Sequence, residues 1–330
     1  MLVLVSVLLG ATAIGETAIA PLDAVRIVGA RLGLLETGTS PRAYEAILLD
    51  IRLPRIVLAG VVGGALAVAG AAFQGVFRNP LAEPTLVGPA AGAALGAVLA
   101  FVLPLPASWL GVGLVQLMAF GGGLAAAAVV WPLARVGAVT PVTSLLLAGV
   151  AVSTLASAVT TVLMYLHGDQ LLAIYGWLLG GFNVASWNQV RLVAPLVALA
   201  GVALLLAVRP LDLLQLGEEE AAMLGLDVER VKLGLMIAAT LATAAAVSAA
   251  GPIAFVGLIV PHAVRIVAGP GHRRLVPLSG LLGAAFLVAA DALARSLPGP
   301  SEVPVGVVTA AVGAPFFLLL LRRQKRGTAG

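Results

Sequence analysis

QGVFRNPLAEPTLVGPAAG (residues 74–92) separates two long apolar runs of the chain. The stretch contains three prolines, together with Arg78, Asn79 and Glu83. Proline cannot continue a helix from its interior, and the residue before a proline is also kept away from the helical conformation. The stretch therefore predicts a compact turn between two helices, with Pro80 and Pro84 ending the first of them.

The composition around this turn is that of a membrane protein. The 330 residues are 61% hydrophobic and 10% charged, and the mean hydropathy is +1.10. A soluble domain is about half apolar and about a quarter charged. The excess of apolar residues must face lipid, where the backbone has to satisfy its own hydrogen bonds. The runs are continuous and lack period-two alternation, so we expect an all-α, polytopic membrane protein.

Ten apolar runs are candidates to cross the ~30 Å hydrocarbon core, so we expect about ten transmembrane helices in one domain, residues 1–330. The first run ends in Ala-Ile-Ala, as a signal peptide would, but it lacks basic residues and Glu16 interrupts it. A first membrane helix is therefore expected over a cleaved signal. The ten runs are 1–20, 56–77, 85–103, 110–134, 144–166, 190–208, 233–250, 253–268, 275–294 and 303–321.

The basic residues predict an orientation, because cytoplasmic loops carry more Lys and Arg. With both termini in the cytoplasm, 12 of the 19 lysines and arginines lie inside and 7 lie outside. The bias is modest because the first outside loop, residues 21–55, holds five arginines.

Several chemistries lack their residues in this sequence. There is no cysteine, no Gly-Lys-Ser/Thr of a phosphate-binding loop and no Gly-x-Ser-x-Gly. His167, His262 and His272 do not have metal-ligand spacing. The sequence therefore predicts no catalytic residues, no metal site and no enzyme activity, and any ATP hydrolysis would belong to another subunit. The net charge of +4 comes without a basic tract interleaved with aromatics, so no nucleic-acid partner is expected.

An ion-coupled secondary carrier is the rival class of transporter. Such a carrier needs ionisable groups at membrane depth, and only Glu16 and Asp291 fall inside the predicted spans. Asp291 lies four residues before Arg295, which predicts an ordinary ion pair on one helix face. These observations disfavour the carrier, and it remains the remote alternative.

The segment 209–232 is too polar to span a membrane and lies inside by this topology. Three glutamates (218–220) suit the N-terminus of a short helix. Gly225 would end that helix and Asp227 would cap a second one. Two short helices at right angles would offer a protrusion to a cytoplasmic partner, and a solvated loop is the alternative.

Long motifs resemble one family, the FecCD-type permease subunits of type II ABC importers for iron-siderophore complexes, haem and cobalamin. The resemblance runs from about residue 50 to the C-terminus, while the first fifty residues match only in hydropathy. The motifs, in the family's order, are IRLPR (51–55), GAAFQGVFRNPLAEPTLVG (70–88), LLLAGV (145–150), LGEEEAAMLGLDV (216–228), GLIVPHAVR (257–265), HRRLVPLSGLLGAAFLVAADALAR (272–295) and EVPVGVVTAAVGAPFFLLLL (302–321).

The resemblance implies a ten-helix permease in the cytoplasmic (inner) membrane of a prokaryote. A second copy or a sister permease would complete the pathway, and two ATP-binding subunits would hold ATP and Mg²⁺, with no cofactor in this chain. A periplasmic or lipid-anchored binding protein would dock outside. An iron-siderophore complex is the first choice of substrate because it is the commonest assignment, with cobalamin and haem as alternatives.

The resemblance also assigns residues to three roles. Arginines of the outer face would receive glutamates of the binding protein, and arginine suits this role because its planar fork pairs a carboxylate twice. Thr143 is the weaker gate assignment because Pro141 stands at a position that is polar in the family. The docking residues are Arg52, Arg55 and Arg295; the cytoplasmic gate is Asn79 and Thr143; the ATPase-coupling residues are Gly217, Glu218, Ala221, Leu224 and Gly225.

Overall fold

The computed structural model describes residues 2–13, 19–31, 33–34, 42–84, 88–109, 112–297 and 302–327 of the chain. These residues are almost entirely helical, as the sequence predicts. A two-residue antiparallel pairing of β1 (Ser108–Trp109) with β2 (Val112–Gly113) precedes α6. The helices are α1 (Leu2–Ala13), α2 (Pro21–Arg31), α3 (Arg42–Ala46), the π-helix η1 (Ile47–Arg52), α4 (Leu53–Val76), α5 (Pro89–Val102), α6 (Leu114–Ala134), α7 (Val142–Leu166), the 3-10 turn η3 (Gly168–Gln170), α8 (Leu171–Leu178), α9 (Trp187–Leu206), α10 (Val208–Leu214), α11 (Glu218–Met223), α12 (Val228–Ala250), α13 (Val256–Ala268), α14 (His272–Ser296) and α15 (Val305–Gly327).

Each of the ten predicted runs carries a helix, but the count of ten spans is not established. Among the described residues, six helical segments are long and apolar enough to cross a membrane: Ala43–Val76, Leu114–Ala134, Val142–Leu166, Trp187–Leu206, Val228–Ala250 and His272–Ser296. The other apolar helices are shorter. With 14 and 13 residues, α5 and α13 are only about 21 and 20 Å long at 1.5 Å per residue. Glu16, in the first predicted run, lies outside the described residues.

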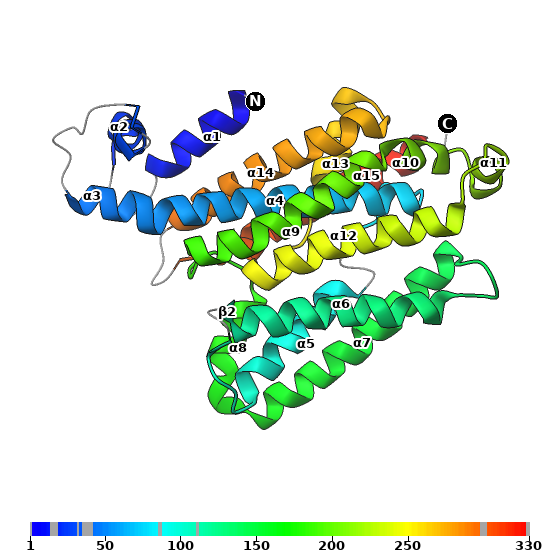
Figure 1. Cartoon of the computed structure of the whole chain (residues 1–330), viewed down its shortest axis with the longest axis horizontal. Coiled ribbons are helices and arrows are strands. Elements are labelled where there is room, and N and C mark those ends of the chain that lie inside the picture. The colour runs from blue at the N-terminus through cyan, green and yellow to red at the C-terminus, as the bar shows by residue number, and fades with distance from the viewer. Residues whose placement is uncertain are drawn as a thin grey trace.

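Two helices form the centre of the bundle (Figure 1). The most apolar windows of α4 and α12 are 72% and 78% buried, whereas those of α6, α7 and α9 are 22% buried. α4 packs on α14, α12 and α13, and α12 also packs on α9 and α6. α5, α6 and α7 form a separate layer beside this centre, and α6 and α5 of this layer pack on α12. The peripheral helices therefore leave apolar faces for lipid or for a partner chain.

Glycines let the central helices approach to backbone contact. A Cβ at Gly63 of α4 would strike the carbonyl of Gly283 in α14, and a Cβ at Gly70 would strike the carbonyl of Gly257 in α13. Small residues allow this close approach in membrane helices, where packing rather than hydrophobicity drives association. The glycine-rich pattern of the sequence thus serves tight packing.

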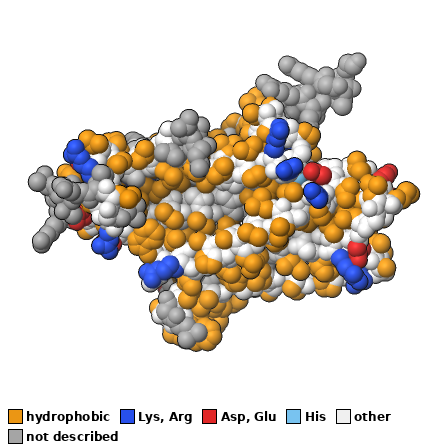
Figure 2. Space-filling view, turned by 45° about the horizontal axis from the view of Figure 1, so that its top comes forward, with side chains coloured by type: hydrophobic (Ala, Val, Ile, Leu, Met, Phe, Trp, Pro, Cys, Tyr) orange, Lys and Arg blue, Asp and Glu red, His pale blue; other side chains and the backbone are white. Residues whose placement is uncertain are grey.

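Charged side chains gather at the two ends of the bundle and apolar side chains cover the middle (Figure 2). We call the end with Arg52, Arg55 and Arg295 the arginine end. The opposite end, formed by α10, α11 and the start of α12, is the coupling end (Figure 1). An apolar band between two charged ends is the surface of a multi-pass membrane protein.

The chain between α4 and α5 turns back into the bundle after α4 ends at Val76. A Cβ at Gly257 would strike both Pro84 and the carbonyl of Leu66. Leu66 precedes the end of α4 by ten residues, about 15 Å along the helix axis. The re-entrant segment, residues 77–84, therefore runs back beside α4. α5 then begins at the buried Pro89, which is consistent with its short length.

Candidate functional site

The three predicted docking arginines come together at the arginine end. Arg55, near the start of α4, donates from Nε and Nη2 to the Asp291 carboxylate of α14 at 2.9–3.1 Å. Its Nη1 donates to Glu302 Oε2 at 2.7 Å. Arg295 donates from Nε to Asp291 Oδ2 at 3.1 Å, which confirms the predicted pair four residues apart on one helix.

These arginines are buried and already have partners within the chain. Arg52 and Arg55 are 6% and 9% exposed. Arg52 donates from Nη1 to the carbonyl of Thr12 at 2.6 Å, and Arg295 donates to the carbonyl of Ala11 at 3.3 Å. The family resemblance implied arginines on the outer face that would receive glutamates of a binding protein. The structure instead has a buried cluster, because Asp291 and Glu302 supply carboxylates from the chain itself.

The most accessible member of this arginine cluster is Glu302, which sequence reasoning missed. Its side chain is 41% exposed, compared with 10% for Arg55 and 1% for Asp291. Glu302 opens the motif EVPVGVV that leads into α15, and a single acidic residue in a loop gave no reason to choose it. Among the described residues, the arginine cluster therefore contains three arginines and two carboxylates.

The predicted gate residue Asn79 lies in a turn built by the end of α4. Arg78 has a left-handed φ of 49°, the Asn79 N–H donates to the carbonyl of Gln74, and the Arg78 N–H donates to that of Gly75. This is the Schellman pattern that ends many helices, with arginine where glycine is usual. Asn79 Oδ1 accepts a hydrogen bond from the Leu81 N–H at 2.9 Å, so its side chain stabilises the turn. The sequence predicted that Pro80 and Pro84 end this helix. Instead α4 ends at Val76, four residues before Pro80, and the Schellman turn ends it.

The second predicted gate residue, Thr143, stands in the first turn of α7. Pro141 precedes this helix in an extended conformation and Thr143 is exposed. Since α7 packs on α5 and α6, the two gate residues belong to different layers of the bundle at the same end.

The predicted coupling segment folds largely as expected. α11 begins with the three glutamates, and Gly225, with φ of 88°, ends it in a Schellman turn in which the Leu226 N–H donates to Ala221. Asp227 caps the next helix by accepting from the Arg230 N–H at 3.2 Å. That next helix is not short, because it continues as the central helix α12.

Burial divides the five predicted coupling residues. Ala221 is fully buried and Gly217, with φ of 132°, is also buried, so both shape the segment from within. Leu224 and Gly225 are exposed. Within the segment 209–232 the most exposed apolar side chain is Met223 at 85%, a residue to which the sequence assigned no role. Met223 and Leu224 together form an apolar protrusion of the coupling end.

A family model for the FecCD transport family matches residues 2–323. The chain belongs to this family. As a FecCD protein it is a membrane permease of the ABC importer class, a transport component whose ATPase lies in a separate subunit.

Several FecCD relatives cover most of the chain. It is 50% identical over 285 residues to the cobalamin import system permease protein BtuC of Halobacterium salinarum, covering 86% of this chain and 76% of the relative. It is 41% identical to the hemin transport system permease HmuU of Yersinia pestis (90% and 89% covered). It is 42% identical to the Fe(3+) dicitrate transport permease FecD of Escherichia coli (88% and 90% covered).

A solved structure shares this FecCD fold. It is an inward-facing conformation of a metal-chelate type ABC transporter, with a TM-score of 0.83 and 29% identity over 98% of this chain and 97% of that one. Within the described residues no group of His, Cys, Asp or Glu is arranged to hold a metal ion.

Proposed function

We propose that the chain is the permease subunit of an ATP-driven importer for a bulky metal chelate, with cobalamin as the favoured substrate. The 50% identity to the cobalamin permease of Halobacterium salinarum carries this proposal. The other substrates named among the relatives come with identities of 42% or less.

An iron-siderophore complex is the second candidate. It is the first choice from the sequence because it is the commonest assignment in the family, and permeases for Fe(3+)-hydroxamate and Fe(3+) dicitrate are 40% and 42% identical to the chain. Haem is supported by the 41% identical hemin permease. The shared chemistry of all three is a metal held inside a large organic ligand.

The proposed assembly uses both ends of the bundle. The coupling end faces the cytoplasm, where two ATP-binding subunits contact Met223 and Leu224. The arginine end faces outward and receives the substrate-binding protein. A second copy of the chain or a sister permease completes the pathway, and Asn79 and Thr143 close its cytoplasmic mouth. The apolar band between two charged ends supports this orientation axis.

Docking at the arginine end requires an exchange of carboxylates. Arg55 is already paired with Glu302, so a glutamate of the binding protein has to replace Glu302 on the Arg55 fork. Glu302 is half-exposed and the Asp291 pair is buried. The exchange can therefore take place at Glu302 while Asp291 continues to hold Arg55 in position.

Transport by the reconstituted complex tests the function. The permease, its ATP-binding subunits and the binding protein encoded beside it are placed in proteoliposomes and supplied with labelled cobalamin, a ferric siderophore or haem. We expect ATP-dependent uptake of cobalamin. Uptake of only the ferric siderophore or haem would replace the substrate, while uptake by the permease alone under an ion gradient would support the secondary carrier instead.

A further inference from the structure

Lys232 is a buried lysine in the first turns of α12. Its side chain is only 1% exposed, and it lies near the N-terminus of the helix, where the helix dipole disfavours a positive charge. Removing an ammonium group from water costs several kcal/mol unless strong partners replace the water. Lys232 can therefore remain charged at this position only if strong hydrogen-bond acceptors surround its ammonium group.

Three acceptors surround the Lys232 ammonium. Nζ lies 2.7 Å from Glu229 Oε1 and 3.0 Å from Glu218 Oε2, and it donates to the carbonyl of Thr140 at 2.8 Å. An ammonium has three N–H donors, so these contacts match its capacity. The carboxylates are 28% and 33% exposed, which leaves them in contact with water at the surface of the cluster.

The acceptors come from three different parts of the fold. Glu229 belongs to α12 itself, whereas Glu218 opens α11, the helix with the exposed apolar protrusion. Thr140 belongs to the connection between α6 and α7, three residues before the gate residue Thr143. One nitrogen atom therefore joins the coupling segment to the gate segment.

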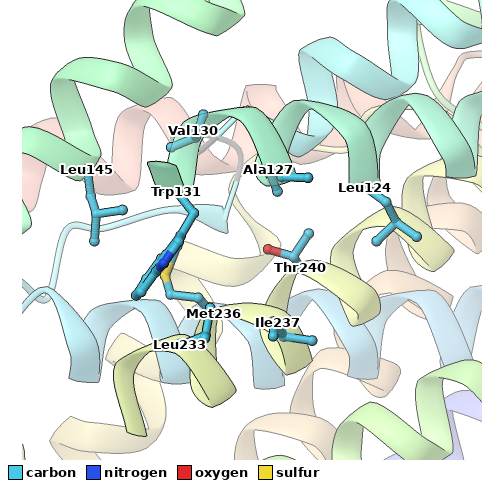
Figure 3. A pocket seen from close by; sticks show the side chains of 10 residues that line it. Leu124, Ala127, Val130, Trp131, Leu145, Leu233, Met236, Ile237 and Thr240 are labelled. Atoms are coloured by element: carbon cyan, nitrogen blue, oxygen red, sulfur yellow. The ribbon is translucent and has the colours of Figure 1, made fainter. Parts of the chain in front are cut away.

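An apolar cavity lies beside this junction (Figure 3). It has a volume of about 290 Å³ and is bounded by α6, α7 and α12, with Trp131 and Leu145 on one side and Leu233 and Met236 on the other. Leu233 directly follows Lys232, so the cavity begins next to the lysine. Side chains leave this space unfilled, and the polar contacts of Lys232 hold the end of the α6–α7 layer to α12.

We propose that Lys232 is a positioning residue that carries a displacement of α11 to the α6–α7 connection and so to Thr143. This inference rests on the proposed importer function. Glu218 is the accessible end of the path, because an ATP-binding subunit that moves α11 also moves the carboxylate bound to Lys232. The ammonium then moves the Thr140 carbonyl, and the adjacent cavity gives the α6–α7 layer room to shift.

The test follows the gate in the complete permease–ATPase complex. Because the chain has no cysteine, Thr143→Cys and, separately, Asn79→Cys introduce unique thiols whose labelling is measured with and without ATP. We expect ATP to change labelling at both positions by about fivefold or more. Adding Lys232→Met should abolish the change at position 143 and retain it at 79, because Lys232 bonds to Thr140 in the α6–α7 connection and to no described residue of the turn around Asn79.

Arg230→Met is the matched control, since it removes a positive charge two positions away. Arg230 pairs with Asp227 at the surface, where the two side chains are 88% and 53% exposed, so this variant should retain both changes. A second variant covers the case in which Lys232→Met does not assemble. Glu218→Gln neutralises the α11 carboxylate bound to the same lysine and should also reduce the change at 143.

The labelling results distinguish the role proposed for Lys232 from the proposed gate role of Thr143. A nucleotide response at 143 that survives both Lys232→Met and Glu218→Gln overturns the inference while the proposed gate stands. If Lys232→Met abolishes the nucleotide response at position 79 as well as at 143, the lysine has a general structural role, and the proposed link to Thr143 is wrong. If Thr143→Cys alone never responds to ATP, the proposed gate is wrong and the inference falls with it.

Discussion

Arg55 and Asp291 are 236 residues apart in the chain and are joined by three hydrogen bonds of 2.9–3.1 Å. The pair links the start of α4 to the last turns of α14. The same two helices meet again along their length, where Gly63 and Gly283 bring the backbones into contact. α14 is thus firmly joined to the central helix α4 at two places along its length.

Asp291→Asn should destabilise the protein strongly. The carboxylate is 1% exposed and two arginines depend on it, and removing one partner of a buried ion pair typically costs about 3–5 kcal/mol. Thermal unfolding of the detergent-solubilised permease measures the effect. Asp227→Asn breaks the exposed pair with Arg230 and should change stability by less than ~1 kcal/mol; equal losses for the two variants would argue against the central role of Asp291.

Glu302→Gln should strengthen docking of the binding protein. The substitution removes the charge of the carboxylate that accepts from Arg55 Nη1. Arg55 can then pair more easily with a glutamate of the binding protein. The dissociation constant, measured on the intact complex at low and high salt, reports the change, and salt should reduce the gain by screening. Asp50→Asn removes an exposed charge at the same end and serves as the control. Weaker docking by Glu302→Gln would show that Glu302 takes part in the interface.

Leu224→Asp should reduce co-purification of the ATP-binding subunit while insertion in the membrane is retained. Leu224 is 62% exposed on the apolar protrusion beside Met223, so the new charge meets the partner and not the core. Val136→Asp is the control, because it places the same charge at an apolar side chain of similar exposure, 60%, in the α6–α7 connection. It should leave co-purification unchanged. If Leu224→Asp assembles as the unchanged protein does, the proposal that α11 contacts the ATP-binding subunit is wrong. Ala221→Glu is unsuitable here, because Ala221 is fully buried and the change would disrupt α11 itself.

Gly70→Ala should destabilise the fold even though alanine is the better helix former. The added methyl group would strike the backbone of Gly257 in α13, and overpacking of this kind typically costs about 1–3 kcal/mol. Gly234→Ala is the matched control in α12, where the added methyl group meets nothing within 4 Å and should stabilise by up to ~1 kcal/mol. Unfolding in a denaturant series distinguishes the two, and a stabilising Gly70→Ala would show that α4 and α13 can separate at little cost.

The helical fold could be predicted because apolar runs and turn residues are local signals. The glutamates at 218–220, Gly225 and Asp227 mark the ends of α11 and α12 correctly, since capping depends on neighbours in the chain. The i, i+4 spacing likewise gave the pair between Asp291 and Arg295. The length of α12 was missed in part, because a polar first turn concealed that it belongs to a central helix.

Contacts between distant segments could not be predicted in this way. Nothing near Lys232 in the sequence indicates that its charge is buried against Thr140, 92 residues earlier. The pairing of Arg55 with Glu302 is equally non-local, 247 residues apart. The three arginines that the motifs assigned to docking lie at one end of the bundle, but their burial depends on which carboxylates the packing places beside them.

The re-entrant segment contains or meets both non-glycine residues that adopt a left-handed backbone among the described residues, Arg78 (φ 49°) and Phe255 (φ 70°). Glu83 links the segment to Phe255, since its carboxylate accepts a hydrogen bond from the Phe255 N–H at 2.6 Å. Sparsely populated backbone conformations of this kind cost about 1–3 kcal/mol each. A rearrangement that returned either residue to the right-handed region would recover that free energy, so the strain narrows the gap between this conformation and an alternative one. Arg78→Gly would remove the penalty in the present conformation alone and shift the population toward it.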